Sequence, residues 1–531
     1  MKNLYKIAFV IAVSLVIACN AQKSTNINPS EDNKGATSVS NGTKKNILFL
    51  AIDDLKPLLS NYGASQVITP NFDRLAKMGM TFTNAHVQYA VCGPSRASVM
   101  TGANPDKTKV WDLHTDFRES APDLVSMPEY LISQGYETTA VGKIYHKGSS
   151  APGHDGKSWS IPHELPKNYD PKYGDAAFEY YQNPETKKKM NALIAEGEAK
   201  GIKGGKMRGY VFKRLKPSTE SADVSDESYQ DGLYTQTALK QLADLENSGK
   251  PWFLGVGYQK PHLPFVAPKK YWDLYDRSKI KLAEFQELAE GTPKFAYHSF
   301  GELRAFSDID NKLGIGDKLP EAKQRELIHG YMACISYIDA QLGKLFDELE
   351  KRNILDDTVI VLWGDHGWHL GDHTEWCKHS NFEQATRIPF MFAGPGVKAN
   401  QKSHHPVNLV DLFPTVFDLA NVAQSPQTDG KSLVPLLDND TSTSIDMDYA
   451  YHQYKRGKRM GYAVRTDRYR YTEWHDNDYR SFKAYNESNI IARELYDYDK
   501  DPLETRNLVK DPAYNAVVSE LKSTLKNHLT K

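Results

Sequence analysis

Two uninterrupted apolar runs are the clearest pattern in this chain. They cover Asn46–Ile52 and Thr358–Trp363, and each stops abruptly at a group of acidic residues. A strand that is buried on both faces of a parallel sheet has apolar side chains at every position, so these runs predict two such strands. In parallel α/β sheets, ligands bind beyond the carboxyl ends of the strands. We therefore expect the acidic residues after both runs to share one site.

The alternation of shorter patterns predicts the fold class. Three more strands are expected at 137–141, 252–258 and 389–393, and helical periodicity covers 71–79, 127–134, 231–247 and 325–352. Strands that alternate with helices predict a three-layer α/β sandwich with a mostly parallel central sheet. The regions 149–225 and 276–322 contain Gly, Pro and Lys with weak periodicity, so we expect insertions or long loops there, which often shape substrate sites.

The character of the chain changes near Tyr449. Tyr and Arg alternate with other residues from Gly461 to Trp474, which predicts a small antiparallel sheet, and a terminal helix is expected from Ala513. We therefore expect a main domain over 46–446 and a C-terminal α+β subdomain over 447–531.

The N-terminus has the pattern of a targeting segment. Basic residues precede an apolar run over 7–18, which is shorter than the roughly 20 residues of a membrane-spanning helix. The run ends in Val-Ile-Ala followed by Cys19, as in a bacterial lipobox. We expect a lipoprotein signal peptide over 1–19, lipidation of Cys19, a flexible tether over 20–45, and export to the periplasm or cell surface on a lipid anchor. An ordinary secretory signal with a chance cysteine is the alternative.

Charge and cysteine content exclude several classes of protein. The 66 Lys and Arg residues nearly balance the 67 Asp and Glu residues, so no global positive field favours nucleic acid as a partner. Four cysteines do not make a disulfide scaffold in a chain of 531 residues. Cys334 and Cys377 can either pair in an oxidising compartment or remain buried free thiols.

Four residues after the two long apolar runs are candidate metal ligands: Asp53, Asp54, Asp365 and His366. Carboxylate-rich sets of oxygen ligands suit a hard divalent cation, and calcium tolerates irregular shells better than magnesium does. A turn or a helix cap is the ordinary role of a lone Asp-Asp pair. Because acidic residues follow both predicted strands, a metal site is favoured over a turn or a helix cap.

One cysteine stands at the start of a predicted helix. Cys92 is followed by Gly, Pro, Ser and Arg96. The N-terminal end of a helix attracts anions, and Arg96 in the first turn can hold an anionic oxygen. Taken alone, Cys92 is more simply a buried apolar side chain.

Further basic side chains follow predicted strands. Lys143 and His146 come after the strand at 137–141, and His262 lies in a loop stiffened by two prolines. Lys378 comes after the second apolar run. Each is an ordinary surface residue by itself, but their shared place after strand ends favours a common anion site.

Together these segments resemble the type I sulfatases, the formylglycine-dependent sulfatase family, with the iduronate-2-sulfatase branch as the nearest match. The matching segments follow in the same order from Lys45 to Leu508, and they are 51–55, 92–102, 142–146, 260–265, 364–371, 376–382 and 494–498. The resemblance implies an alkaline-phosphatase-like three-layer α/β fold, with 46–446 as the catalytic domain and a small antiparallel sheet in the C-terminal subdomain.

The resemblance also implies a metal centre and a nucleophile. A maturation enzyme would oxidise Cys92 to formylglycine, whose hydrate attacks sulfate esters. Arg96 would stabilise charge beside it. One Ca²⁺ ion would be bound by the modified Cys92 together with Asp53, Asp54, Asp365 and His366.

The same resemblance assigns the residues around the substrate. Lys143 and Lys378 would grip the sulfate, and His262 would bind the substrate and protonate the departing sugar hydroxyl. His146 would take up a proton as the aldehyde is regenerated. Trp368 would flank the sugar.

These observations predict a sulfatase that acts on sulfated oligosaccharides from polysaccharides. Candidate substrates are glycosaminoglycan fragments with 2-O-sulfated uronate, and algal polymers such as ulvan with sulfated rhamnose beside uronate. A phosphoester or phosphonate hydrolase of the alkaline phosphatase superfamily is one alternative. A non-catalytic glycan-binding lipoprotein is another.

Overall fold

The computed structural model describes residues 42–146, 152–166, 180–438, 448–481 and 484–530. The predicted signal peptide and Cys19 lie outside these residues. The last residues of the predicted tether are bound to the folded chain. Lys45 donates its backbone N–H to the Ala420 carbonyl at 3.2 Å, and Asn421 donates from its side chain to the Thr43 carbonyl at 3.0 Å. Within the described ranges, no helix is long and apolar enough to cross a membrane.

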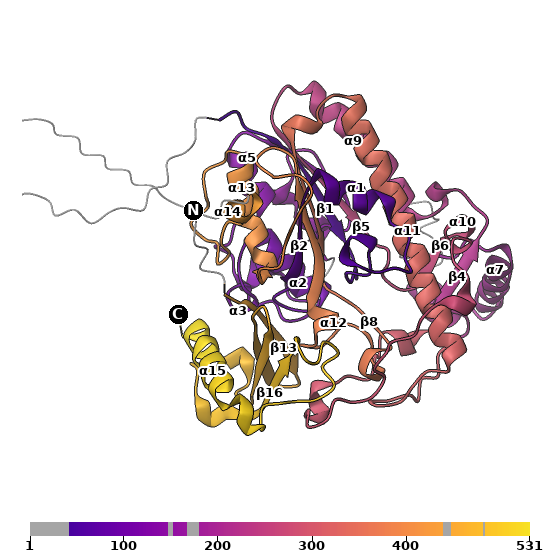
Figure 1. Ribbon diagram of the computed structural model, residues 1–531. Helices are drawn as coiled ribbons and strands as arrows, with labels where there is room; N and C mark the ends of the chain where they lie inside the picture. The colour runs from indigo at the N-terminus through magenta and orange to yellow at the C-terminus, as the bar shows by residue number, and fades with distance from the viewer. Residues whose placement is uncertain (1–41, 147–151, 167–179, 439–447, 482–483, 531) are drawn as a thin grey trace, which may run out of the picture. The chain divides into compact units, whose positions relative to one another are not determined.

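A mostly parallel sheet forms the centre of the fold, as predicted (Figure 1). Its strand order is β11-β2-β10-β7-β1-β5-β3, with β12 also paired to β2. All neighbouring pairs are parallel except those of β10, which runs antiparallel to both β7 and β2. The strands are β1 (Asn46–Ile52), β2 (Gly79–His86), β3 (Glu137–Gly142), β5 (Trp252–Tyr258), β7 (Thr358–Gly364), β10 (Arg387–Ala393), β11 (Gln401–Ser403) and β12 (Val407–Asn408).

Helices cover both faces of this sheet and enclose two hydrophobic cores. In β1, Leu48 and Leu50 face one core, whereas Ile47 and Phe49 face the other, which is why the strand is apolar from Ile47 onward. The first core contains residues of α1 (Pro70–Met78), α9 (Gln230–Asn247) and α11 (Glu321–Lys351), and the second contains residues of α2 (Cys92–Thr101), α5 (Met127–Ser133) and α13 (Leu412–Leu419). The predicted three-layer sandwich is confirmed.

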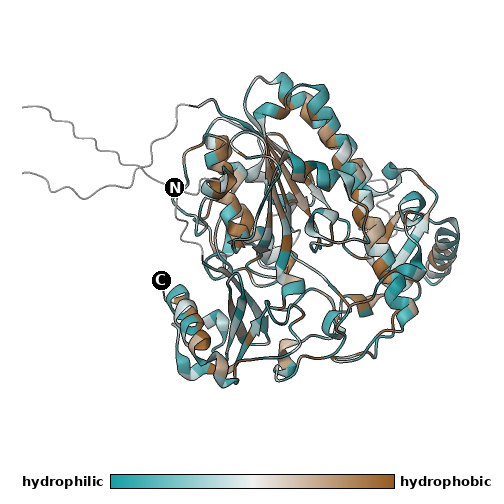
Figure 2. Ribbon diagram, viewed as in Figure 1, coloured by the Kyte–Doolittle hydropathy of each residue, from teal (hydrophilic) through white to brown (hydrophobic). Residues whose placement is uncertain are grey.

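The insertion over 149–225 is more regular than predicted. It contains α7 (Pro184–Ala199), α8 (Gly205–Phe212) and β4 (Thr219–Ala222), which pairs with β6 (Phe265–Pro268). The expectation of loops failed there because α7 buries only Met190 and Gly197 and so lacks a clear apolar stripe. Figure 2 shows α7, at the right edge, as mostly hydrophilic. The region over 276–322 contains short 3₁₀ turns, as expected for a long loop.

Short elements complete the main domain. They are α3 (Pro105–Thr108), α4 (Phe117–Ser120), α6 (Pro152–Asp155), α10 (Lys269–Trp272), α12 (Glu383–Thr386), α14 (Val434–Leu437), β8 (His369–Leu370) and β9 (Trp376–Cys377). Cys92, Cys334 and Cys377 are all buried free thiols, so the alternative of a Cys334–Cys377 disulfide is wrong.

The predicted C-terminal antiparallel sheet is also present. Its order is β13 (Ala450–Arg456), β14 (Arg459–Arg465), β15 (Tyr469–His475) and β16 (Ile490–Asp497), and α15 (Asn515–Leu529) packs against it (Figure 1). Arg456 at the end of β13 donates to the carbonyl oxygens of Phe295 at 2.9 Å and Ala296 at 2.8 Å. These bonds fix the long loop of residues 276–322 to the C-terminal sheet.

Candidate active site

Four parallel strands, β7, β1, β5 and β3, bring their carboxyl ends to one edge of the sheet. The residue after each strand extends the ladder, because Asp365 donates its backbone N–H to Ile52 at 3.2 Å and Asp53 donates to Tyr258 at 3.1 Å. Lys143, directly after β3, donates in the same way to β5 at 2.7 Å. The side chains that the sequence places after different strands therefore meet at one edge.

Asp53, Asp54, Cys92 and His366 form a buried cluster, in which each residue has one ligand atom within 4.8 Å of the others. Nε2 of His366 lies 3.1 Å from Asp54 Oδ1 and 3.2 Å from Cys92 Sγ. Asp365 lies beside this cluster, with its Oδ1 atom 3.6 Å from the same imidazole nitrogen. Several carboxylates and one imidazole, all converging in a buried place, fit a divalent cation.

Arg96 contacts two of these carboxylates and holds them in place. Its side chain is fully buried, and it donates from Nε to Asp365 at 2.8 Å and from one terminal nitrogen to the Ile144 carbonyl at 2.9 Å. A second terminal nitrogen lies 3.4 Å from Asp53. Because Asp365 also accepts the backbone N–H of Asp54 at 2.9 Å, its carboxylate orientation is fixed by two donors.

Two lysines keep the aspartates ionised. Burial opposes ionisation of Asp53, but the charges of Lys143, His262 and Arg96 together outweigh it and hold the pKa of Asp53 well below its usual value. Nζ of Lys143 lies 2.5 Å from Asp53 Oδ2. Burial also opposes ionisation of Asp54, whose pKa falls to about 2 under the charges of His262 and Lys378. Lys378 Nζ is 3.1 Å from both oxygens of Asp54.

Cys92 begins helix α2 and is 2% exposed. Burial, and then the charge of Asp53, raise the pKa of its thiol. The thiolate is therefore disfavoured, and an unmodified thiol here is a poor nucleophile near neutral pH.

His262 is held by its loop and is 30% exposed. The carboxylate of Asp231 accepts the backbone N–H groups of Gln259 at 2.7 Å and Lys260 at 3.1 Å. Lys260 in turn donates its ammonium to the carbonyl oxygens of His262 at 2.5 Å and Pro264 at 2.9 Å. His262 donates from Nδ1 to the Leu263 carbonyl at 2.7 Å, which leaves Nε2 directed at the carboxylates.

Glu302 is a site residue that the sequence did not reveal. Its Oε1 atom lies 3.1 Å from His262 Nε2, and its Oε2 atom lies 2.9 Å from Lys378 Nζ and 3.4 Å from His379 Nε2. Burial opposes its ionisation, but Lys378 and His262 hold the pKa of Glu302 well below the usual value. It lies in the long loop without periodicity, where no sequence signal separates it from other acidic residues.

Sequence comparisons identify the family of the chain. The profile of the family described as "Sulfatase" matches residues 45–422. The profile described as "N-sulphoglucosamine sulphohydrolase, C-terminal" matches residues 371–531. The chain belongs to the sulfatase family. It is thus a sulfuric ester hydrolase, and the predicted family is confirmed.

A curated relative agrees with this assignment, and two solved structures agree with the fold. The sulfatase is 32% identical to mouse iduronate 2-sulfatase over 90% of its own length and 93% of that protein. Its fold is similar to that of a solved protein in complex with its substrate D-glucosamine-2-N,6-O-disulfate, with TM-score 0.67, 22% identity and coverage of 92% and 97% of the two chains. It is also similar to the phosphonate monoester hydrolase of Silicibacter pomeroyi, with TM-score 0.68, 22% identity and coverage of 91% and 95%.

The structure adds the surroundings of two more predicted residues, Trp368 and His146. Trp368 is 1% exposed and lies under Lys378, whose Nζ is 4.9 Å from the ring centroid. It therefore packs against the lysine that the sequence places at the sulfate. Burial and the charge of Lys143 lower the pKa of His146 to about 3, so its imidazole is neutral near pH 7.

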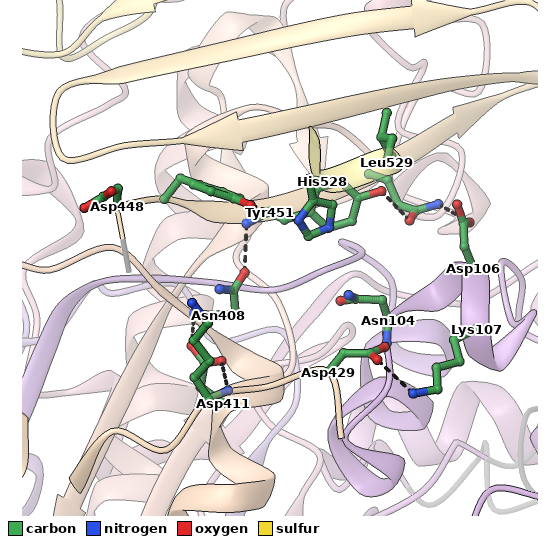
Figure 3. A pocket seen from close by; sticks show the side chains of 13 residues that line it. Asn104, Asp106, Lys107, Asn408, Asp411, Asp429, Asp448, Tyr451, His528 and Leu529 are labelled. Carbon is green, nitrogen blue, oxygen red and sulfur yellow. Dashed lines mark hydrogen bonds and ion pairs between the residues drawn. The ribbon is translucent and has the colours of Figure 1, made fainter. Parts of the chain in front are cut away.

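The sulfatase also has a separate cavity of about 480 Å³ between α3 and the C-terminal sheet (Figure 3). Its polar groups already bind one another. Asp411 accepts the backbone N–H groups of Asn408 at 2.8 Å and Lys431 at 2.9 Å, and Asp429 accepts the ammonium of Lys107 at 2.8 Å. This cavity contains none of the residues that the four strand ends bring together, so the chemistry belongs to the strand-end site.

Proposed function

We propose that this sulfatase hydrolyses sulfate monoesters of anionic oligosaccharides, with a formylglycine made from Cys92 as nucleophile and one calcium ion as cofactor. The observation that carries the proposal is the place of Cys92. It begins a helix, lies within 4.8 Å of three metal-ligating side chains, and has a pKa raised by burial and by Asp53. A thiol in such surroundings is unsuited to act unmodified, whereas a hydrated aldehyde there would supply a hydroxyl nucleophile.

Calcium would be held by the carboxylates and the imidazole of the cluster. The proposed ligands are Asp53, Asp54, Asp365, His366 and the modified Cys92. A bound divalent cation would polarise sulfate oxygens and favour ionisation of the hydroxyl nucleophile. Arg96 would keep Asp53 and Asp365 oriented toward the ion.

Positive side chains around the cluster would receive the sulfate group. Lys143 and Lys378 are directed at the carboxylates and would bind sulfate oxygens from two sides. His262 presents Nε2, and we propose that it gives a proton from this atom to the departing sugar oxygen. His146, neutral near pH 7, would take up a proton when the nucleophile is regenerated. Glu302 would position both His262 and Lys378.

For the substrate we propose a sulfated saccharide with further negative groups. The similarity to an iduronate 2-sulfatase over nearly the full length supports 2-O-sulfated uronate in glycosaminoglycan fragments. Sulfated rhamnose or uronate of algal polymers such as ulvan is the second candidate.

The phosphoester or phosphonate hydrolase alternative has one structural point in its favour. A second group of possible ligand atoms, from Asp54, His262 and Glu302, lies beside the first, as a two-metal phosphatase would need. However, Lys378 Nζ lies 3.1 Å from Asp54 and 2.9 Å from Glu302. An ammonium group thus already supplies the positive charge at this place, which favours the sulfatase with one metal ion.

The test is a direct one. The protein would be produced together with a formylglycine-generating enzyme, and the Cys92 peptide would be examined by mass spectrometry. Metal content would be measured, and turnover would be compared on para-nitrophenyl sulfate, para-nitrophenyl phosphate and defined sulfated oligosaccharides. A thiol that persists in fully active protein, or preferential phosphate turnover with two bound zinc ions, would contradict the proposal.

We further propose that the protein is an exported lipoprotein, anchored through Cys19. Labelling of cells with a radioactive fatty acid tests this, with Cys19→Ser as the control. Equal labelling of both proteins, or none in either, would exclude the anchor.

A further inference from the structure

A basic segment without acidic residues lies in the insertion before β4. Between positions 200 and 216 there are seven basic residues and no Asp or Glu: Lys200, Lys203, Lys206, Arg208, Lys213, Arg214 and Lys216. Of these, only Lys200 has a carboxylate within ion-pair distance in the described part of the chain, so Arg208 and Lys216 are among six cations without one. Unpaired cations that lie close together favour the binding of an anion.

Aromatic rings hold these two cations near each other. Nζ of Lys216 lies 4.0 Å from the ring centroid of Phe306 and 6.0 Å from that of Phe212. Cζ of Arg208 lies 5.8 Å from the same Phe212 ring. The two side chains therefore share one ring, which limits their movement away from each other.

The charges of the pair act on each other. Burial lowers the pKa of Lys216, and the positive charge of Arg208 lowers it further, whereas Glu302 opposes both effects. Lys216 is thus a half-buried cation with a like charge beside it. A bound anion would relieve this repulsion.

Hydrogen bonds connect Lys216 to the loop that contains Glu302. Ser307 donates its backbone N–H to the Lys216 carbonyl at 2.9 Å and accepts the N–H of Lys216 on its hydroxyl at 2.8 Å. Ser307 follows shortly after Glu302, which contacts His262 and Lys378. The segment that follows α8 is therefore fixed to the loop that enters the active site.

Tyr180 connects Arg208 to the same region. Its hydroxyl donates at 3.2 Å to Gln259, in the loop that presents His262. Burial raises the pKa of Tyr180, and the charges of both Lys143 and Arg208 lower it. Arg208 is thus close enough to influence a residue that also responds to the sulfate-binding lysine.

We propose that Arg208 and Lys216 form an anion subsite, which binds a second negative group on the saccharide whose sulfate ester is hydrolysed. The group is a carboxylate or a sulfate, since guanidinium and ammonium groups bind both. The inference deepens the proposed function and rests on it. It explains how an active site that itself contains Glu302 retains a polyanionic substrate.

The test measures inhibition, so that the oligosaccharides need not be substrates. The mature, calcium-loaded full chain would hydrolyse para-nitrophenyl sulfate, which has no second anion. Three competitors of equal length would be compared: a neutral oligosaccharide, one with carboxylates only and one with sulfates only. The variants are Arg208→Ala and Lys216→Ala, with Arg208→Lys as a conservative change. Lys206→Ala is the matched control. This substitution also removes one positive charge from α8, but on another face of the helix.

We expect Arg208→Ala and Lys216→Ala to raise the inhibition constant of one or both anionic competitors about tenfold. The competitor that responds identifies the group. Turnover of para-nitrophenyl sulfate, inhibition by the neutral competitor and the behaviour of Lys206→Ala should not change, and Arg208→Lys should retain most of the affinity. The proposal is overturned if the wild-type protein is not inhibited by either anionic competitor, if the inhibition constants do not change, or if Lys206→Ala has the same effect.

Failure of the proposed function would be visible separately. If the mature protein does not turn over para-nitrophenyl sulfate, the same competitors would be titrated by calorimetry. Weaker binding of an anionic competitor by Arg208→Ala and Lys216→Ala, but not by Lys206→Ala, would uphold the subsite in a protein that is not an active sulfatase. Equal binding by all variants would overturn it.

Discussion

The Sγ atom of Cys92 lies 3.2 Å from Nε2 of His366. The cysteine reaches this place because it begins helix α2, whereas the histidine follows the buried strand β7. The contact joins the candidate nucleophile to the candidate metal ligands. A cysteine buried only for packing would be surrounded by apolar groups, and this one is surrounded by ionisable groups.

The first prediction concerns Cys92 itself. We expect Cys92→Ala to reduce kcat for sulfate esters by a factor of about a thousand or more, because the nucleophile is lost. Thermal unfolding should change little, since alanine fills most of the volume of the small side chain. Cys334→Ala, which removes a buried free thiol from helix α11, is the control for activity. Near-normal turnover by Cys92→Ala would disprove the nucleophile assignment.

The second prediction concerns calcium. Asp53, Asp54 and Asp365 are buried together, so a bound cation should stabilise the folded protein. Calcium at about 100 times its dissociation constant adds about 2.7 kcal/mol to the free energy of unfolding. Chelation should therefore lower the unfolding temperature and abolish turnover, and calcium should restore both. In Asp54→Asn the added calcium should shift the unfolding temperature less. Identical melting curves with and without calcium would contradict the metal site.

The third prediction concerns Glu302. This residue contacts His262 and Lys378 and is not one of the proposed metal ligands. Glu302→Gln keeps the shape of the side chain and removes its charge. The loss of charge-assisted hydrogen bonds worth about 1.5–3 kcal/mol should lower kcat about 10- to 100-fold. KM for small aryl sulfates should change less, because the lysines that we propose to bind sulfate remain. A pH–rate profile separates positioning from simple misfolding, since only the former should change its shape.

Glu287→Gln is the matched control for this variant. Glu287 lies in the same long loop, but its side chain is 67% exposed and pairs with Lys318. Its substitution should leave kcat and the pH profile unchanged. If Glu302→Gln behaves like Glu287→Gln, Glu302 does not position the active-site residues.

Much of this site could be predicted from the sequence because parallel strands converge. β1 and β5 match the predicted ranges, since both of their faces are buried and nearly every residue is apolar. Once the strands are known, the residues that follow them must meet at one edge. The structure accordingly brings Asp53, Asp365 and Lys143 together. The local pattern of apolar residues was therefore sufficient to predict that these three side chains lie close together.

The rest depends on tertiary packing. Glu302 reaches the active site from the long loop of residues 276–322, whose path is set by contacts such as that of Ser307 with Lys216. The reversed direction of β10 was also not readable, because an apolar strand looks the same in either orientation. Trp368 was expected near the sugar because it follows the metal residues, and its packing against Lys378 was not readable from that place.

The last prediction concerns stability and pH at a place remote from the metal ligands. Asp226 lies 2.8 Å from Lys270 and 2.9 Å from Lys344, and it also accepts hydrogen bonds from Gln341 and Tyr271. Burial opposes its ionisation, but these partners lower the pKa of Asp226 from 3.8 to about 2. Since the folded pKa lies below the unfolded one, the ionised carboxylate stabilises the folded state above about pH 5, and this contribution is lost as the pH falls toward 2.

Asp226→Asn should therefore lower the free energy of unfolding at pH 7 by about 1–2 kcal/mol, a value that allows for screening by solvent. The difference from wild type should shrink as the pH is lowered from 5 toward 3, measured by urea unfolding at each pH. Asp347→Asn is the control, because Asp347 is 72% exposed and its pair with Arg74 should contribute less than about 1 kcal/mol. A difference for Asp226→Asn that stays constant with pH would mean that altered packing, and not the lost charge, causes the destabilisation.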